Sequence, residues 1–364
     1  MITIDYPVII TLIGATIIGI SSGIISCYCV LREQSLLGDA IAHAALPGLC
    51  LAFLITLNKH PLVLFIGAIL AGVAGTMLIT TIIRKSILKE DTALGIILSV
   101  FFGFGTLLLT MIQKIPTARQ SGLENYLFGN AASMLLEDIK VMGILTFAIV
   151  IITLLFWKEI KTLIFDRQHF QSIGFSAQKV ELLLIFLTVI TIIIGLQAVG
   201  VILMSAMIIA PATAAKLWQN RLSSVMILSV FFAILSGLIG VLMSSSIPNI
   251  PTGPAIVITI SSFVIISLFI SPKGILTKGI QTLLNNRTIH MDSILTNLYT
   301  LAKTHNDLTH PHDIKTLRIL GGIPSQYLLE KLEKEGLIYY HHDTSWGLTS
   351  AGITKAIQIL QRVH

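Results

Sequence analysis

Charged side chains are scarce in this sequence. Asp, Glu, Lys and Arg make up 12% of its 364 residues, whereas soluble domains carry roughly 25%. The shortage is confined to residues 1 to about 275, which are almost continuously apolar, and the remainder has the composition of a soluble domain. The composition therefore excludes a fully soluble protein. It predicts an all-α polytopic membrane bundle over residues 1–275 and a small soluble domain over 276–364.

Cysteine and the common catalytic motifs are also sparse. The three cysteines lie inside apolar segments and form no C-x-x-C pair, so we expect small buried residues and no disulfide framework. No G-x-x-x-x-G-K-[ST] phosphate loop is present, which excludes ATP hydrolysis by this sequence itself. No H-E-x-x-H motif or Ser, His and Asp arrangement indicates an intramembrane enzyme. The sequence predicts no enzymatic activity and no permanently bound cofactor.

Apolar runs of the length that a bilayer requires predict about nine transmembrane spans. They lie near residues 8–30, 36–56, 61–83, 92–113, 134–156, 179–195, 197–215, 222–243 and 250–271. The sixth and seventh are joined by almost nothing, around Gly195 to Gln197, so eight spans remain an alternative. Pro211 should kink or end the seventh span.

Basic residues orient these spans. One set of alternate loops holds ten of them and the other set holds four. The richer set is Arg32, Arg84, Lys85, Lys89, Lys158, Lys161, Arg167, Lys179, Lys216 and Arg221; the poorer set is Lys59, Lys114, Arg119 and Lys140. Because cytoplasmic loops carry the excess of Lys and Arg, the first set is predicted to be cytoplasmic. With nine spans, the N-terminus is outside and the C-terminus is cytoplasmic.

Two ionisable residues stand out within the second span. Asp39 and His43 are four positions apart and fall on one face of a helix. His43 lies about ten residues after Arg32 and Glu33, or ~15 Å along a helix, near the middle of the hydrocarbon core. A carboxylate and an imidazole at that depth offer oxygen and nitrogen donors to a divalent metal ion. The alternative is an aspartate near the membrane surface and a histidine hydrogen-bonded within the bundle.

Five stretches, in the same order, resemble the integral-membrane permease subunits of ATP-binding cassette importers for manganese, zinc and iron. They are GDAIAHAALPG (38–48), DTALGIILSVFFGFG (91–105), LFGN (127–130), VGVILMSAMIIAPATAA (199–215) and GPAIVITISSF through SPK (253–273). The resemblance covers roughly the first 275 residues. It implies a location in the cytoplasmic membrane of a bacterium, and it implies that Asp39 and His43 hold the transported ion.

The same resemblance assigns further roles. Met204 and Met207 would help to close the path on the outer side. The loop at 165–179 would be the coupling helix that docks on the ATPase, with Asp166 as its cap and Gly174 at its end. The implied partners are a separate ATP-binding subunit, an extracytoplasmic metal-binding protein and a second permease, identical or related. The alternative for each methionine is a core side chain.

The soluble part is predicted to fold as helices near 290–304, 313–320 and 324–336, strands at 337–340 and 346–349, and a last helix that Ser350 caps. PSQYLLEKLEKEGLIYY and WGLTSAG resemble the winged helix-turn-helix domain of iron- and manganese-dependent repressors of the diphtheria-toxin-repressor type. By that resemblance Ser325, Gln326 and Tyr327 open a DNA-recognition helix.

Three functions remain open from the sequence. The first is the permease of an ATP-driven metal importer with a regulatory or DNA-binding tail. The second is an ion-driven secondary metal transporter, which the single deep carboxylate, Asp39, disfavours. The third is a membrane-anchored, metal-responsive transcription regulator. The third helix of the tail carries two lysines against three glutamates, so a protein-interaction role for the tail is an alternative to DNA binding.

Overall fold

The computed structural model describes two compact units, Met1–Gly274 (unit 1) and Ile275–His364 (unit 2). Its description leaves out residues 1–5, 35, 58–59, 115–133, 248–249, 306, 314–315, 318–325, 342–344 and 364. The LFGN stretch at 127–130 and Ser325 therefore lie outside the described residues. Each unit is described below by itself.

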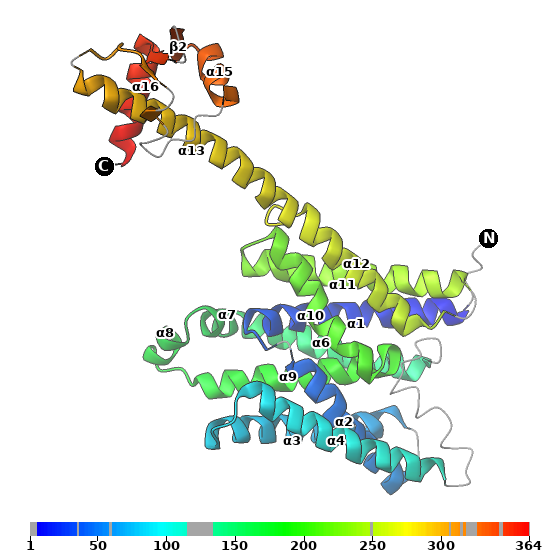
Figure 1. Ribbon diagram of the computed structural model, residues 1–364. Coiled ribbons are helices and arrows are strands. Elements are labelled where there is room, and N and C mark those ends of the chain that lie inside the picture. The colour runs from blue at the N-terminus through cyan, green and yellow to red at the C-terminus, as the bar shows by residue number, and fades with distance from the viewer. Residues whose placement is uncertain are drawn as a thin grey trace. The chain divides into compact units, whose positions relative to one another are not determined.

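Unit 1 is a bundle of helices (Figure 1). Its helices are α1 (Tyr6–Leu31), α2 (Leu37–Thr56), α3 (Pro61–Lys85), α4 (Glu90–Gln113), α6 (Leu136–Leu155), α7 (Trp157–Phe165), α8 (Arg167–Ser172), α9 (Ala177–Val199), α10 (Val201–Trp218), α11 (Leu222–Ser246) and α12 (Thr252–Ile270). Within the described residues, eight helices are long and apolar enough to cross a membrane: α1, α2, α3, α4, α6, α9, α11 and α12. The polytopic helical bundle is thus confirmed with eight spans among the described residues, and a ninth span through α10 stays a prediction.

The helix α10 (Val201–Trp218) is the segment that the prediction counted as the seventh of nine spans. It is separated from α9 by one residue, Gly200, whose φ of 88° lies in the region that favours glycine. The break was expected near Gly195 to Gln197, and this placement was wrong. Gly195 could not mark the break because it sits inside α9, where the sulphur of Met204 packs against it.

Pro211 lies inside α10 and does not end it, because α1 supports the backbone around it. The Ala212 amide donates to Oγ of Ser26 at 3.0 Å, and this hydroxyl lies 3.4 Å from the Ile209 carbonyl oxygen, to which it donates. A neighbouring helix therefore supplies partners for backbone groups near the proline, as apolar surroundings require.

The centre of unit 1 is α2, which contacts α3, α4, α9 and α10. Two glycines allow the backbones of α2 and α3 to meet: a Cβ atom on Gly48 would lie 2.2 Å from the Gly67 carbonyl oxygen, and one on Gly67 would lie 2.6 Å from that of Gly48. Small residues permit such close approach of helices in lipid. This contact fixes the helix that carries Asp39 and His43.

Gly19 and Gly23 let α1 pack closely on α11. A Cβ atom on Gly23 would lie 2.5 Å from Cα of Val230, and one on Gly19 would lie 2.9 Å from Cα of Ile234, so α1 and α11 are in backbone contact. The Ser229 hydroxyl also donates to the Gly23 carbonyl at 2.8 Å. The pair therefore joins α1 to α11.

Unit 2 contains α13 (Ile275–Thr304), β1 (His312–Asp313), α15 (Gln326–Lys334), β2 (Ile338–His341), β3 (Ser345–Leu348) and α16 (Ser350–Val363). The three short strands form an antiparallel sheet in the order β1-β3-β2, in which Trp346 faces His312 on one side and Tyr340 on the other. Buried leucines and isoleucines of α13 and α15 pack with Trp346 and Leu348. With so little sheet, the winged-helix assignment stays a prediction.

Three local predictions for unit 2 were wrong. Ser350 is the first residue of α16 and not its cap, because Oγ1 of Thr349 accepts from the Gly352 amide at 3.1 Å. The first helix starts at residue 275 and not near 290, because no proline interrupts the helical stretch and one interior glycine, Gly279, costs only about 1 kcal/mol. The helix expected over 313–320 does not include Asp313, which pairs with Ser345 across the sheet. Most of the rest of that segment lies outside the described residues.

Candidate functional site

Asp39 and His43 face each other within α2. Nε2 of His43 lies 3.5 Å from Oδ1 of Asp39 across one helical turn. The His43 side chain is 12% exposed and the Asp39 side chain is 35% exposed. The two donors are therefore near enough to share one ion, and the carboxylate is the more accessible of the pair.

The surroundings of His43 give it an aromatic contact but no hydrogen-bond partner for one ring nitrogen among the described residues. Its ring meets the ring of Phe102 on α4 edge-on, with centroids 4.7 Å apart. Its Nδ1 atom is buried and has no hydrogen-bond partner among the described residues. Pro47, four residues on, has no N–H, so it cannot donate to the His43 carbonyl as a regular helix would require. A buried nitrogen without a partner is costly unless a ligand or water meets it.

Asp39 and His43 lie closer to the start of their helix than the sequence suggested. Because α2 begins at Leu37, Asp39 belongs to the first turn and His43 lies roughly 9 Å along the axis. The expected depth was larger because it was counted from Arg32, whereas α2 begins five residues later, at Leu37. The positive end of the α2 dipole favours the Asp39 carboxylate, and it would weaken cation binding at this level if no anion were present.

The two methionines of α10 are buried, with Met204 at 0% and Met207 at 1% exposure. The sulphur of Met204 lies against Gly195 on α9, and α10 meets the start of α2 through Ile208 beside Gly38. The described residues contain no group of three His, Cys, Asp or Glu side chains able to hold a metal ion. Asp39 and His43 are therefore joined by no third side chain of this kind among the described residues, and no described contact joins Met204 to them.

The predicted coupling segment is a short helix between α7 and α9. Oδ1 of Asp166 accepts from the His169 amide at 2.8 Å, which confirms Asp166 as the cap of α8. Gly174, with φ of 92°, follows the helix, as predicted. Phe170 is buried and stacks on Phe175, with ring centroids 5.2 Å apart. These contacts give the segment a defined shape.

The segment also exposes large apolar side chains. Phe165, Ile173 and Phe175 are each more than half exposed. Phe165 ends α7, and Ile173 and Phe175 follow α8, so the three flank α8 at the end of the bundle where α9 begins (Figure 1). Neighbouring exposed apolar side chains on an aqueous surface indicate a site of protein contact.

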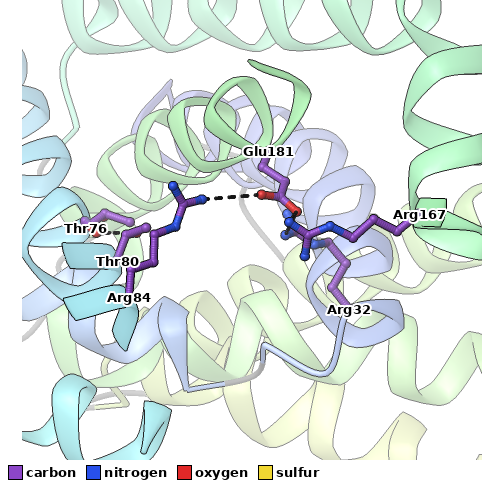
Figure 2. Close-up of polar contacts among 6 residues, drawn as sticks. All are labelled: Arg32, Thr76, Thr80, Arg84, Arg167 and Glu181. Carbon is purple, nitrogen blue, oxygen red and sulfur yellow. Dashed lines mark hydrogen bonds and ion pairs between the residues drawn. The ribbon is translucent and has the colours of Figure 1, made fainter. Parts of the chain in front are cut away.

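A charged cluster that sequence reasoning missed lies beside this segment (Figure 2). Glu181 on α9 meets Arg167 at 3.2 Å, Arg32 at 3.6 Å and Arg84 at 3.9 Å. Burial lowers the pKa of Arg32, and the Glu181 carboxylate opposes that shift. The contacts show that three loops assigned to one side of the membrane do meet at one end of the bundle. No sequence signal could pair these residues, because they belong to separate elements.

The predicted DNA-contact residues are only partly described. Gln326 and Tyr327 open α15, and Tyr327 is 58% exposed. The helix itself carries two lysines and two glutamates, so it has no net charge to attract phosphates. Gly336, with φ of 70°, ends it in a Schellman arrangement, in which the Leu337 amide donates to the Leu332 carbonyl.

Three histidines gather where α13 gives way to β1. The ring centroids of His305, His310 and His312 are 4.9 to 5.3 Å apart. Burial lowers the pKa of His312, and the other two imidazoles lower it further. Nε2 of His312 is buried without a hydrogen-bond partner among the described residues. Protonation of His312 is therefore disfavoured in the folded unit.

Acidification should destabilise unit 2 through His312. The unfolded chain binds a proton near the ordinary pKa of about 6.5 and the folded unit binds it only at lower pH, so stability falls as pH drops below about 6.5. We expect His312→Gln to reduce this pH dependence, measured as hydrogen exchange of amides in β1 and β3 at pH 7.5 and 5.5 in the full chain. His60→Gln is the control, because His60 is exposed in unit 1. An unchanged pH dependence in His312→Gln would contradict the assignment.

Residues 5–271 match the model of the ABC 3 transport family. The manganese transport system membrane protein MntC of Bacillus subtilis is 37% identical over 345 residues, covering 94% of this chain and 79% of that protein. The zinc transport system membrane protein TroC of Treponema pallidum is 41% identical over 273 residues, covering 75% of this chain and 92% of that protein.

One solved structure is also similar along most of unit 1. PsaBC from Streptococcus pneumoniae in complex with Fab has a TM-score of 0.67 and 34% identity, covering 74% of this chain and 93% of that chain. The match to the Bacillus subtilis protein is longer than unit 1, so it extends into unit 2.

Proposed function

This chain belongs to the ABC 3 transport family, and from that premise we propose that it is the membrane permease of an ATP-driven importer of divalent metal ions. It is a multi-pass membrane protein and a transport subunit, not an enzyme. The relatives named above are a manganese and a zinc system, so these ions are the first candidates and iron is the third.

The observation that carries the metal assignment is the Asp39–His43 pair. Its oxygen and nitrogen donors suit manganese, zinc and iron alike. Two protein ligands leave most of the coordination sphere to water, which gives weak binding. A transport site must bind well enough to admit the ion and weakly enough to release it. The pair would therefore bind the ion transiently during its passage. Met204 and Met207 would close the path on the outer side.

The energy source lies on another chain. An ATP-binding subunit would dock at the 165–179 segment, where Asp166 and Gly174 define α8 and the exposed side chains of Phe165, Ile173 and Phe175 offer apolar contact. Movement of that subunit would reach the bundle through α8, because Arg167 in its first turn pairs with Glu181 on α9. An extracytoplasmic metal-binding protein would deliver the ion, and a second permease, identical or related, would complete the pathway.

The docking proposal predicts that Ile173→Asp abolishes uptake of radioactive manganese or zinc by cells that also express the ATP-binding subunit. A charged side chain in an apolar contact lowers the affinity for the ATP-binding subunit, because removing the charge from water costs free energy. Wild-type uptake should also vanish without that subunit. Ile87→Asp is the matched control, since Ile87 is fully exposed between α3 and α4, outside the segment. Full uptake by Ile173→Asp would refute docking here, and uptake without the subunit would favour the ion-driven transporter.

For the membrane orientation we propose that α7, α8 and unit 2 are cytoplasmic, in the cytoplasmic membrane of a bacterium. The support is the basic character of the loops that Glu181 brings together. Unit 2 is proposed to be a winged-helix accessory domain that contacts protein. The neutral charge of α15 gives no support to DNA binding, which weakens the alternative of a membrane-anchored transcription regulator.

A further inference from the structure

A cleft opens between α3 and α9 at the end of the bundle where the arginines gather. Its polar part has a volume of about 790 Å³ and its apolar part about 400 Å³. Val73 and Met77 of α3 and Leu182 and Ile185 of α9 line both parts. The two parts therefore adjoin each other, and together they make one cleft with a charged end and an end that is apolar apart from Lys179.

The charged end is electropositive. Four basic side chains line it, Arg32, Arg84, Lys85 and Arg167, against two acidic ones, Glu90 and Glu181. Arg84 and Arg167 are 52% and 57% exposed although both contact Glu181. Each guanidinium has five N–H donors, and one carboxylate shared by three arginines cannot accept from all of them. The end retains both charge and donors for an anion (Figure 2).

The apolar end is lined by exposed side chains of α3 and α9. Met77, Leu182 and Phe186 line it and are 52%, 50% and 41% exposed, on two of the helices that are apolar enough to cross a membrane. Large exposed apolar side chains on such helices contact lipid. A cleft that is open to lipid along its length and basic at the cytoplasmic level matches the shape of a phospholipid.

The cleft is separate from the Asp39–His43 site. Ile41 points toward α3 and α9, because a Cβ atom on Gly72 would lie 3.7 Å from Cγ2 of Ile41 and 2.9 Å from Cγ1 of Val189. Residues two positions away on a helix are turned by about 200°. Asp39 and His43 therefore face away from the cleft, and its positive charge would repel a metal ion.

We propose that this cleft binds one anionic phospholipid of the cytoplasmic leaflet. Its phosphate would accept hydrogen bonds from Arg84 and Arg167, and one acyl chain would lie along Met77, Leu182 and Phe186. Guanidinium groups suit phosphate because they donate two parallel hydrogen bonds. A bare phosphate ion would leave the apolar part unfilled. Since Arg167 also begins α8, the lipid would help to set the position of the segment on which the ATPase is proposed to dock.

Native mass spectrometry of the detergent-purified full chain tests this proposal, with phosphatidylglycerol, phosphatidylcholine and inorganic phosphate as probes. We expect phosphatidylglycerol to bind more tightly than phosphatidylcholine, and Arg84→Ala/Arg167→Ala to weaken it by about 10- to 30-fold, since each basic residue near anionic lipid contributes about a factor of five. Lys158→Ala/Lys161→Ala is the control, because it removes the same charge from exposed positions of α7 outside the cleft.

A second variant keeps the test decisive if the double arginine variant does not fold. Met77→Trp fills the apolar part and leaves every charge in place, so it should lower phosphatidylglycerol binding while melting like the wild type. Equal binding of the two lipids would overturn the proposal. So would unchanged binding in both variants, or competition by millimolar inorganic phosphate, which would indicate an ion site. Since the readout is lipid binding, failure here leaves the transport proposal untouched.

Discussion

Asp39→Asn and His43→Ala should each reduce metal uptake at least tenfold. Each removes one of the two proposed ligand side chains, which are 3.5 Å apart, and the remaining one would not hold a divalent ion against its hydration shell. Asp39→Asn keeps the size of the side chain, so the fold should be retained. Initial rates of radioactive manganese and zinc uptake, normalised to the amount of permease in the membrane, measure the effect.

The loss should be specific to these positions. Glu137→Ala removes an exposed carboxylate from the first turn of α6, which matches Asp39 in charge and helix position. His60→Ala removes an exposed imidazole before α3. Both controls should transport normally. If Asp39→Asn and His43→Ala transported like these controls at equal protein levels, the pair would be a hydrogen-bonded structural feature and the ion would pass elsewhere.

Gly48→Val should abolish accumulation of folded permease. The added Cβ atom would lie 2.2 Å from the Gly67 carbonyl oxygen and 2.4 Å from Cβ of Ala71, so the backbones of α2 and α3 would have to separate. Overpacking costs about 1–3 kcal/mol where side chains can adjust, and here the obstacle is backbone. Fluorescence size-exclusion chromatography and thermal unfolding in detergent measure the outcome.

The control for this packing prediction is another helical glycine. Gly103→Val introduces the same β-branched side chain in α4, but nothing lies within 4 Å of its added Cβ atom. It carries the same cost in helix propensity without a clash. We expect Gly103→Val to unfold close to the wild-type temperature. Equal behaviour of the two variants would show that α2 and α3 can separate without loss of the fold.

Much of unit 1 could be predicted because a bilayer makes simple demands. A span needs only length and apolarity, so the runs near 8–30 and 222–243 correspond to α1 and α11. The ends of α8 were predictable too, because Asp166 caps an amide three residues away and Gly174 follows the end of the same short helix. The start of α13 at Ile275 was not predicted, because a polar stretch without a proline or a clear capping residue is compatible with either a linker or a helix.

The amino-acid sequence by itself determined the apolar bundle, the loops that share one side, and the placement of Asp39 and His43 one turn apart. Each of these depends on composition or on residues a few positions apart, and a helix fixes the relative positions of such residues. Only the tertiary structure decided that Glu181 joins three arginines, that Gly48 meets Gly67, and that α3 and α9 enclose a cleft. Those contacts join residues far apart in the chain, and which of them meet depends on how whole helices pack.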